Sequence, residues 1–154
     1  MKKIVLSFII SLFSLILVFS QDADKILGLW LTQEKDSQVQ IYKGTDGKYY
    51  GKIVWLQTPL ENGKPKVDDQ NPKKSLQNRP IMGLLLLVGF KFDKGDNEWN
   101  DGTIYDPNNG STYDCYMWFE KNDLNTLHVK GYIGFAIIGR QVEWTREQQL
   151  RKQQ

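Results

Sequence analysis

The sequence has one cysteine and one histidine among 154 residues, and both scarcities exclude classes of chemistry. A lone cysteine, Cys115, cannot form an intramolecular disulfide, so packing and hydrogen bonds must stabilise the fold. Zinc sites need several cysteine or histidine ligands, and a catalytic triad needs a histidine base. The single histidine, His128, falls on the expected outer face of a strand. We therefore expect no metal centre, no cofactor and no histidine-based catalysis, and we interpret Cys115 as a core residue.

An excess of charge of either sign is also missing. The chain has 20 Lys and Arg against 18 Asp and Glu, and two of the lysines, Lys2 and Lys3, precede the apolar N-terminal run. Without those two, the balance is 18 against 18. Surfaces that bind nucleic acid or anionic membranes usually need a basic excess. We therefore expect no nucleic-acid partner and no stable membrane insertion of the mature chain.

The chain has one long apolar run, from Ile4 to Phe19, and it directly follows Lys2 and Lys3. This run is interrupted by three serines and is shorter than the roughly 20 apolar residues that span a membrane. The pattern predicts a signal peptide over residues 1–20, cleaved before Gln21, and export to the periplasm or beyond. An uncleaved N-terminal anchor is the alternative.

The remainder predicts one all-β domain over residues 21–147, followed by a polar tail over 148–154 that frays or forms a short exposed helix. Helical periodicity is scarce, and short runs of β-branched and aromatic residues alternate with turn residues. Most connections have hairpin length, so we expect an up-and-down antiparallel barrel of about eight strands. The predicted strands are 27–33, 38–43, 48–56, 84–92, 98–105, 112–120, 126–133 and 137–146.

One connection, residues 57–83, is too long for a hairpin and contains four of the five prolines. Within it, Asn71-Pro72 predicts the start of a short helix that ends before Arg79-Pro80. Strands that alternate in direction would bring this loop, the turn after Tyr105 and the segment between Tyr132 and Arg140 to one mouth of the barrel. Loops of this length are often functional.

The two ends of the predicted barrel carry a recognisable signature. Gly28-x-Trp30, with Trp144 and Arg146 on the final strand, resembles the closure signature of lipocalins and related calycins. We interpret these four residues as structural, with Arg146 stacked on Trp30. A longer ordered set resembles an exported bacterial family, domain of unknown function 2147, over nearly all of residues 26–147. This set comprises Gly51–Leu56, Asn71-Pro72, Leu76, Arg79–Gly83, Trp99, Gly102–Pro107, Gly110, Tyr113, Leu127–Gly134, Gly139-Arg140 and Trp144–Arg146. The resemblance implies a small, exported, lipocalin-like barrel and implies no reaction.

Arginine offers a permanent charge and a fork of donors suited to carboxylate or phosphate. Alternation directs Trp55 and Arg140 inward. An amphipathic ligand at the mouth would place its anionic head group against the arginines and its apolar tail against aromatic rings. The predicted ligand-binding residues are Trp55, Arg79, Tyr105, Asp106, Tyr132 and Arg140. The alternative is that the arginines pair with Asp68, Asp69 or Asp106 and fix the long loop over the barrel.

Three functions follow from these features. The first is a non-catalytic binding module for a small, partly apolar and anionic ligand at the mouth. The second is an envelope protein-interaction module with a solid barrel, in which an outer face containing Tyr116 and Trp118 binds an unknown protein partner. The third is a hydrolase in which Asp106 and a loop carboxylate act as general acid and base, although turn geometry alone also explains Asp106.

Overall fold

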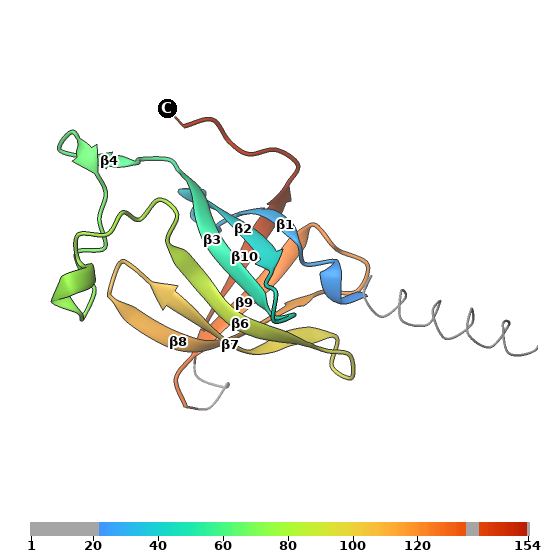
Figure 1. The fold of residues 1–154 in the computed structure, drawn as a ribbon. Coiled ribbons are helices and arrows are strands. Elements are labelled where there is room, and N and C mark those ends of the chain that lie inside the picture. Colours follow the sequence, from blue (N-terminus) through green and yellow to red (C-terminus); the bar gives the residue numbers. More distant parts are fainter. Residues whose placement is uncertain (1–21, 135–138, 154) are drawn as a thin grey trace, which may run out of the picture.

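The computed structural model describes residues 22–134 and 139–153 and confirms a closed antiparallel barrel (Figure 1). Neighbouring strands run in the ring order β1-β10-β9-β8-β7-β6-β3-β2. Each predicted strand lies within two residues of an observed one, although the predicted start of the last strand falls partly outside the described residues. The barrel strands are β1 (Gly28–Leu31), β2 (Ser37–Lys43), β3 (Tyr49–Leu56), β6 (Leu85–Asp93), β7 (Glu98–Asp106), β8 (Ser111–Phe119), β9 (Thr126–Tyr132) and β10 (Gly139–Glu147).

The barrel closes where β1 pairs with β10, with Trp30 opposite Arg146. The Arg146 guanidinium carbon lies 4.2 Å from the Trp30 ring centroid. Its nitrogens donate to the carbonyls of Lys25, Leu27 and Leu124 at 2.6, 2.9 and 2.8 Å. Gly28 has φ +133°, and a Cβ atom there would lie 3.1 Å from an Arg146 nitrogen. Glycine therefore provides both the backbone conformation and the space that this closure needs.

The barrel interior is filled by side chains. Alternation places large apolar residues from every strand inside, and the core includes Trp30, Phe90, Trp99, Met117 and Trp144, all almost completely buried. The rings of Trp99 and Phe119 meet edge to face at a centroid distance of 5.5 Å. Cys115 belongs to the same core, and burial raises the pKa of its thiol, which keeps it protonated and unreactive.

The long connection between β3 and β6 contains a two-stranded hairpin, β4 (Leu60–Glu61) and β5 (Lys64–Pro65), which the sequence did not predict. The predicted helix is a single 3₁₀ turn, η1 (Lys74–Leu76). The Asn71 side chain accepts a hydrogen bond from the Lys73 backbone N–H at 2.9 Å, but it caps a turn and not a helix. The Asn71 amide also donates to the buried Asp68 carboxylate at 2.8 Å, which fixes this part of the loop.

The C-terminal tail is extended and contacts the barrel wall, whereas the sequence suggested a frayed segment or a helix. Figure 1 shows it leaving β10 and running back over the side formed by β1, β2 and β3. The Trp55 indole N–H donates to the Lys152 carbonyl at 3.0 Å, and the Gln153 carboxamide bonds both backbone groups of Leu56. No helix within residues 22–134 and 139–153 has the length and apolar character needed to cross a membrane.

Candidate functional site

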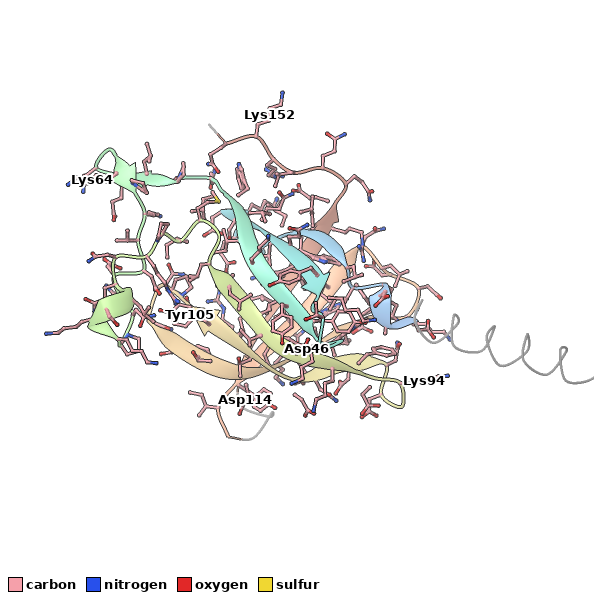
Figure 2. The ribbon with its side chains drawn as sticks, viewed as in Figure 1. Asp46, Lys64, Lys94, Tyr105, Asp114 and Lys152 are labelled. Atoms are coloured by element: carbon pink, nitrogen blue, oxygen red, sulfur yellow. The ribbon has the colours of Figure 1, made fainter. Side chains whose placement is uncertain are left out.

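Strand direction gives the barrel two ends with different connections. The loop end contains the connection 57–83 and the turns after β1 and β7, and the N-terminal end contains residues 22–27 and the turns after β2 and β6. In Figure 2, Lys64 on the long loop and Lys94 in the β6–β7 turn lie on opposite sides of the molecule. Both ends carry cationic side chains, so the groups that surround these side chains determine which end can bind a ligand.

At the loop end, Arg79 and Tyr105 meet at one buried carboxylate, that of Asp68. The Arg79 Nε donates to Asp68 at 2.8 Å, the Tyr105 hydroxyl at 2.6 Å and the Asn71 amide at 2.8 Å. Asp68 is 0% exposed, although it lies in a loop. Burial, together with the bond to Asp68, raises the pKa of Tyr105 and keeps its hydroxyl a donor. These four residues therefore satisfy one another and fix the long loop.

A close backbone contact holds the same loop against the β7–β8 turn. A Cβ atom added to Gly110 would lie 2.0 Å from the Gln70 carbonyl oxygen. In this turn the Asp106 carboxylate accepts bonds from the Asn108 backbone and the Asn109 amide at 2.9 and 3.2 Å. Asp106 thus caps its own turn, and Asp68 is occupied by Arg79, Tyr105 and Asn71. This arrangement does not resemble a general acid and base pair poised around a substrate.

Arg140 lies at the rim of the loop end, the end at which it was predicted, with its side chain on the surface and not in an enclosed interior. Its side chain is 72% exposed and forms an ion pair with Glu34 from the turn after β1. It is the second residue of β10, opposite Gly131 of β9, and its long side chain extends from the strand end to Glu34. Residues 135–138 of the loop between β9 and β10 lie outside the described residues.

Trp55 points away from the interior, contrary to the prediction, and Tyr132 lies on the outer face, where the alternation of its strand places it. In β2, Gln38 faces Trp55 and Val39 faces Ile53, so Val54 is an extra residue in β3. Such a bulge resets the alternation and turns Trp55 to the outer wall, under the C-terminal tail. Tyr132 lies outside because its alternation partner Gly131 faces inward, and its ring contacts Tyr116 at 6.0 Å.

The outer face of β8 and β9 carries a stack of aromatic rings. Trp118 lies between Tyr116 and His128, with centroid distances of 5.3 and 5.1 Å. His128 is 8% exposed and is thus covered by Trp118, although its strand position faces outward as predicted. Because the rings cover one another's faces, this face is a packed stack and not an open aromatic platform.

At the N-terminal end, the surface has a hollow of about 460 Å³ between the ends of two hairpins. The pairing of β3 with β6 stops at Tyr49 and Phe90, while β6 continues to Asp93 against β7. The strands therefore separate here and leave the hollow between them. Its lining residues are Asp22, Ala23, Lys43, Asp46, Gly47, Lys48, Tyr49, Lys91, Phe92 and Lys94.

The hollow combines an apolar base with a cationic rim. Tyr49, Phe92 and Ala23 supply apolar surface, and four lysines outnumber two aspartates in the lining. The Tyr49 hydroxyl donates to Asp24 at 2.6 Å, and burial together with this bond raises the pKa of Tyr49. Lys43 pairs with Asp24 at 2.9 Å, and Lys91 pairs with Asp101 at 3.2 Å on exposed surface. Exposed pairs of this kind are weak and exchange easily with a ligand.

The sequence reasoning missed this hollow because its lysines are scattered at positions 43, 48, 91 and 94. A signal was nevertheless present. Strand direction alternates, and this alternation places the connection 57–83 and the turns after β1 and β7 at one end of the barrel. It places the turns after β2 and β6 together at the other end. Both turns are flanked by lysines, and counting them would have indicated a basic end.

No group of three or more potential metal ligands occurs among the described residues. The buried side-chain polar atoms of these residues all have hydrogen-bond partners.

Comparison with known proteins gives a consistent picture. The model of a family described as uncharacterised protein conserved in bacteria, DUF2147, matches residues 28–146. A solved structure, described as protein HP1028 from the human pathogen Helicobacter pylori that belongs to the lipocalin family, is 25% identical. The match has a TM-score of 0.66 and covers 79% of this chain and 82% of that one. No curated protein matches the sequence.

Proposed function

The chain belongs to the DUF2147 family of bacterial proteins, and from its lipocalin-like barrel we propose that it is a non-catalytic binding protein for a small, partly apolar, anionic molecule. The observation that carries this proposal is the hollow at the N-terminal end, with its lysine rim and aromatic base. Its volume of about 460 Å³ is within the usual range for small-molecule sites. The ligand site therefore lies at the end opposite the predicted mouth.

The contrast between the arginines and the lysines supports this location. Arg79 and Arg146 direct their donors to a buried carboxylate and to backbone carbonyls, whereas Lys43 and Lys91 pair with carboxylates that solvent reaches. The lysine rim surrounds open space, and lysine binds an anion as a point charge without needing a fixed geometry. A phosphate, sulfonate or carboxylate head group fits this rim, and a short apolar body fits against Phe92 and Tyr49.

The proposal includes export. Residues 1–20 have the charge and apolar run of a signal peptide, and cleavage before Gln21 would begin the mature chain beside Asp22 in the hollow. The N-terminal sequence of the protein purified from the cell envelope tests this part. A mature chain that begins near Gln21 supports it, and a chain in the cytoplasmic fraction that still begins at Met1 contradicts it.

The ligand proposal is tested with 8-anilinonaphthalene-1-sulfonate, an anionic aromatic probe whose fluorescence rises on binding. We expect saturable binding at one site. The double substitution Lys48→Ala with Lys94→Ala should weaken it about tenfold or more, because each ammonium group lost removes a charge-assisted contact. Lys64→Ala, on the opposite side of the molecule, is the matched control (Figure 2).

Equal loss of binding in Lys64→Ala would show nonspecific attraction to cationic surface. Unchanged binding in the double variant would show that the probe binds elsewhere, and the proposed site would then be wrong.

A further inference from the structure

The C-terminal tail lies in a groove on the outer wall that is independent of the hollow. The groove is formed by Gln38 of β2, Trp55 and Leu56 of β3, and Glu147 at the end of β10. Gln38 is 0% exposed, and Leu31 and Trp55 are buried without belonging to the barrel's core cluster. The tail is what covers this part of the wall.

Gln38 recognises the main chain of the tail. Its amide donates to the Gln149 carbonyl at 2.9 Å, and its side-chain oxygen accepts from the Arg151 backbone N–H at 3.2 Å. These two main-chain groups flank Leu150, whose own side chain is 57% exposed. The carboxamide therefore binds an extended chain as a neighbouring strand would, independently of the residue between.

Two side chains of the tail add specificity. The Arg151 guanidinium bonds both carboxylate oxygens of Glu147, at 3.1 and 2.9 Å from its Nε and 2.6 Å from a terminal nitrogen, and lies 5.1 Å from the Trp55 ring centroid. The Gln153 carboxamide pairs with both backbone groups of Leu56, at 3.4 and 2.6 Å. The groove thus has one position for a cation and, two residues later, one for a carboxamide.

We propose that this groove is a binding site for an extended peptide of the pattern Arg-x-Gln, which the chain's own tail fills and the tail of a second copy can fill in its place. The groove side chains belong to barrel strands, whose pairing with their neighbours does not involve the tail. The tail contributes polar contacts and leaves Leu150 largely exposed, so little apolar burial holds it in its own chain. Exchange between copies preserves every contact and therefore costs no contact energy.

Complementary variants of the full chain test this proposal. One chain carries a weakened tail, Arg151→Ala with Gln153→Ala, and keeps its groove. The other carries Gln38→Ala, which damages the groove and frees an intact tail. We expect the mixed pair to associate at least tenfold more tightly than either variant with itself, measured by analytical ultracentrifugation. Gln40→Ala, an exposed residue of the same strand, replaces Gln38→Ala in the control pair and should not associate.

A fluorescein-labelled peptide of residues 148–153 provides a second measurement. It should bind the weakened-tail chain, and Gln38→Ala added to that chain should reduce binding at least tenfold. Peptide binding without association of the mixed pair would overturn the second copy as the occupant. Failure of the peptide to bind a cooperatively folded chain ending at Gln148, which has no competing tail, would overturn the groove itself. Neither result depends on the hollow or on its probe.

Discussion

The two ends of the barrel carry cations in opposite situations. At the loop end, Arg79 is bonded to a fully buried carboxylate, whereas at the N-terminal end the lysines surround open space. Arg79 stabilises the long loop through this bond, whereas the lysine rim is accessible to a ligand. Charge alone therefore does not identify a binding site in this barrel. What distinguishes the two ends is how deeply the chain's own carboxylate is buried: Asp68 is 0% exposed, whereas the carboxylates that pair with Lys43 and Lys91 are accessible to solvent.

The largest expected effect comes from removing that anion at the loop end. Asp68→Ala leaves Arg79, Tyr105 and Asn71 without their shared acceptor, and we expect a loss of about 3 kcal/mol in the free energy of unfolding, measured in urea. Asp69→Ala, the exposed neighbour, is the control. Probe binding at the hollow should stay unchanged in both variants. A loss below about 1 kcal/mol would contradict the structural role.

We expect a somewhat smaller loss in the free energy of unfolding when Arg146, at the N-terminal end, is substituted. Arg146→Lys keeps the charge but loses the fork that reaches three carbonyls, and it should cost about 2 kcal/mol of stability. Arg140→Lys tests the same change in an exposed ion pair and should cost under about 0.5 kcal/mol. Similar losses in the two variants would mean that buried carbonyl contacts do not explain the closure.

Added salt should weaken probe binding at the hollow and leave the stabilising contribution of the Asp68 contacts unchanged. Raising the ionic strength from about 0.1 M to 1 M shortens the Debye length from about 10 Å to about 3 Å. We expect the affinity for the sulfonate probe to fall several-fold. The decrease in affinity with ionic strength should be smaller in the variant with Lys48→Ala and Lys94→Ala. The stability difference between wild type and Asp68→Ala should persist, because Asp68 is shielded from solvent. Salt-independent probe binding would show that the lysines do not attract it.

The smallest effect is expected from pH at the C-terminal tail. The bonds from Arg151 lower the pKa of Glu147, so tail binding is strongest above the ordinary glutamate value of about 4.3. As the pH falls through the lowered pKa, the carboxylate takes up a proton and the bound tail loses this contact. The Trp55 indole N–H resonance, identified with Trp55→Phe, should shift in this range by NMR. No shift between pH 5 and 3 would argue against the Glu147 contact.

Much of the fold was predictable from the sequence, because hairpin lengths and period-two patterning are local. The barrel's eight strands followed from them, whereas its lipocalin-like class was implied by the resemblance of Gly28-x-Trp30 and Arg146 to the closure signature of that group. Trp55 was misplaced because the bulge at Val54 has no signature in sequence. The Asp68 cluster was predicted only as an alternative, since nothing local indicates that a loop aspartate becomes fully buried.

The features missed entirely depend on contacts between distant residues. The hollow needs β3 and β6 to separate, and the tail groove joins Gln38 to residues more than 100 positions later. Polar composition correctly indicated that the tail forms no core element. It could not indicate that a buried glutamine would receive the tail's main chain.

Closure of the ring by the last strand also determines when the protein can fold. β1 has no second neighbour until residues 145–147 of β10 have been synthesised and have reached it. Until then β1 and β9 are open edges that can pair with other chains. Contacts over such sequence separations form slowly, because loop-closure entropy is lost before they stabilise the chain. A chain truncated before β10 should therefore aggregate, because β1 and β9 remain open edges.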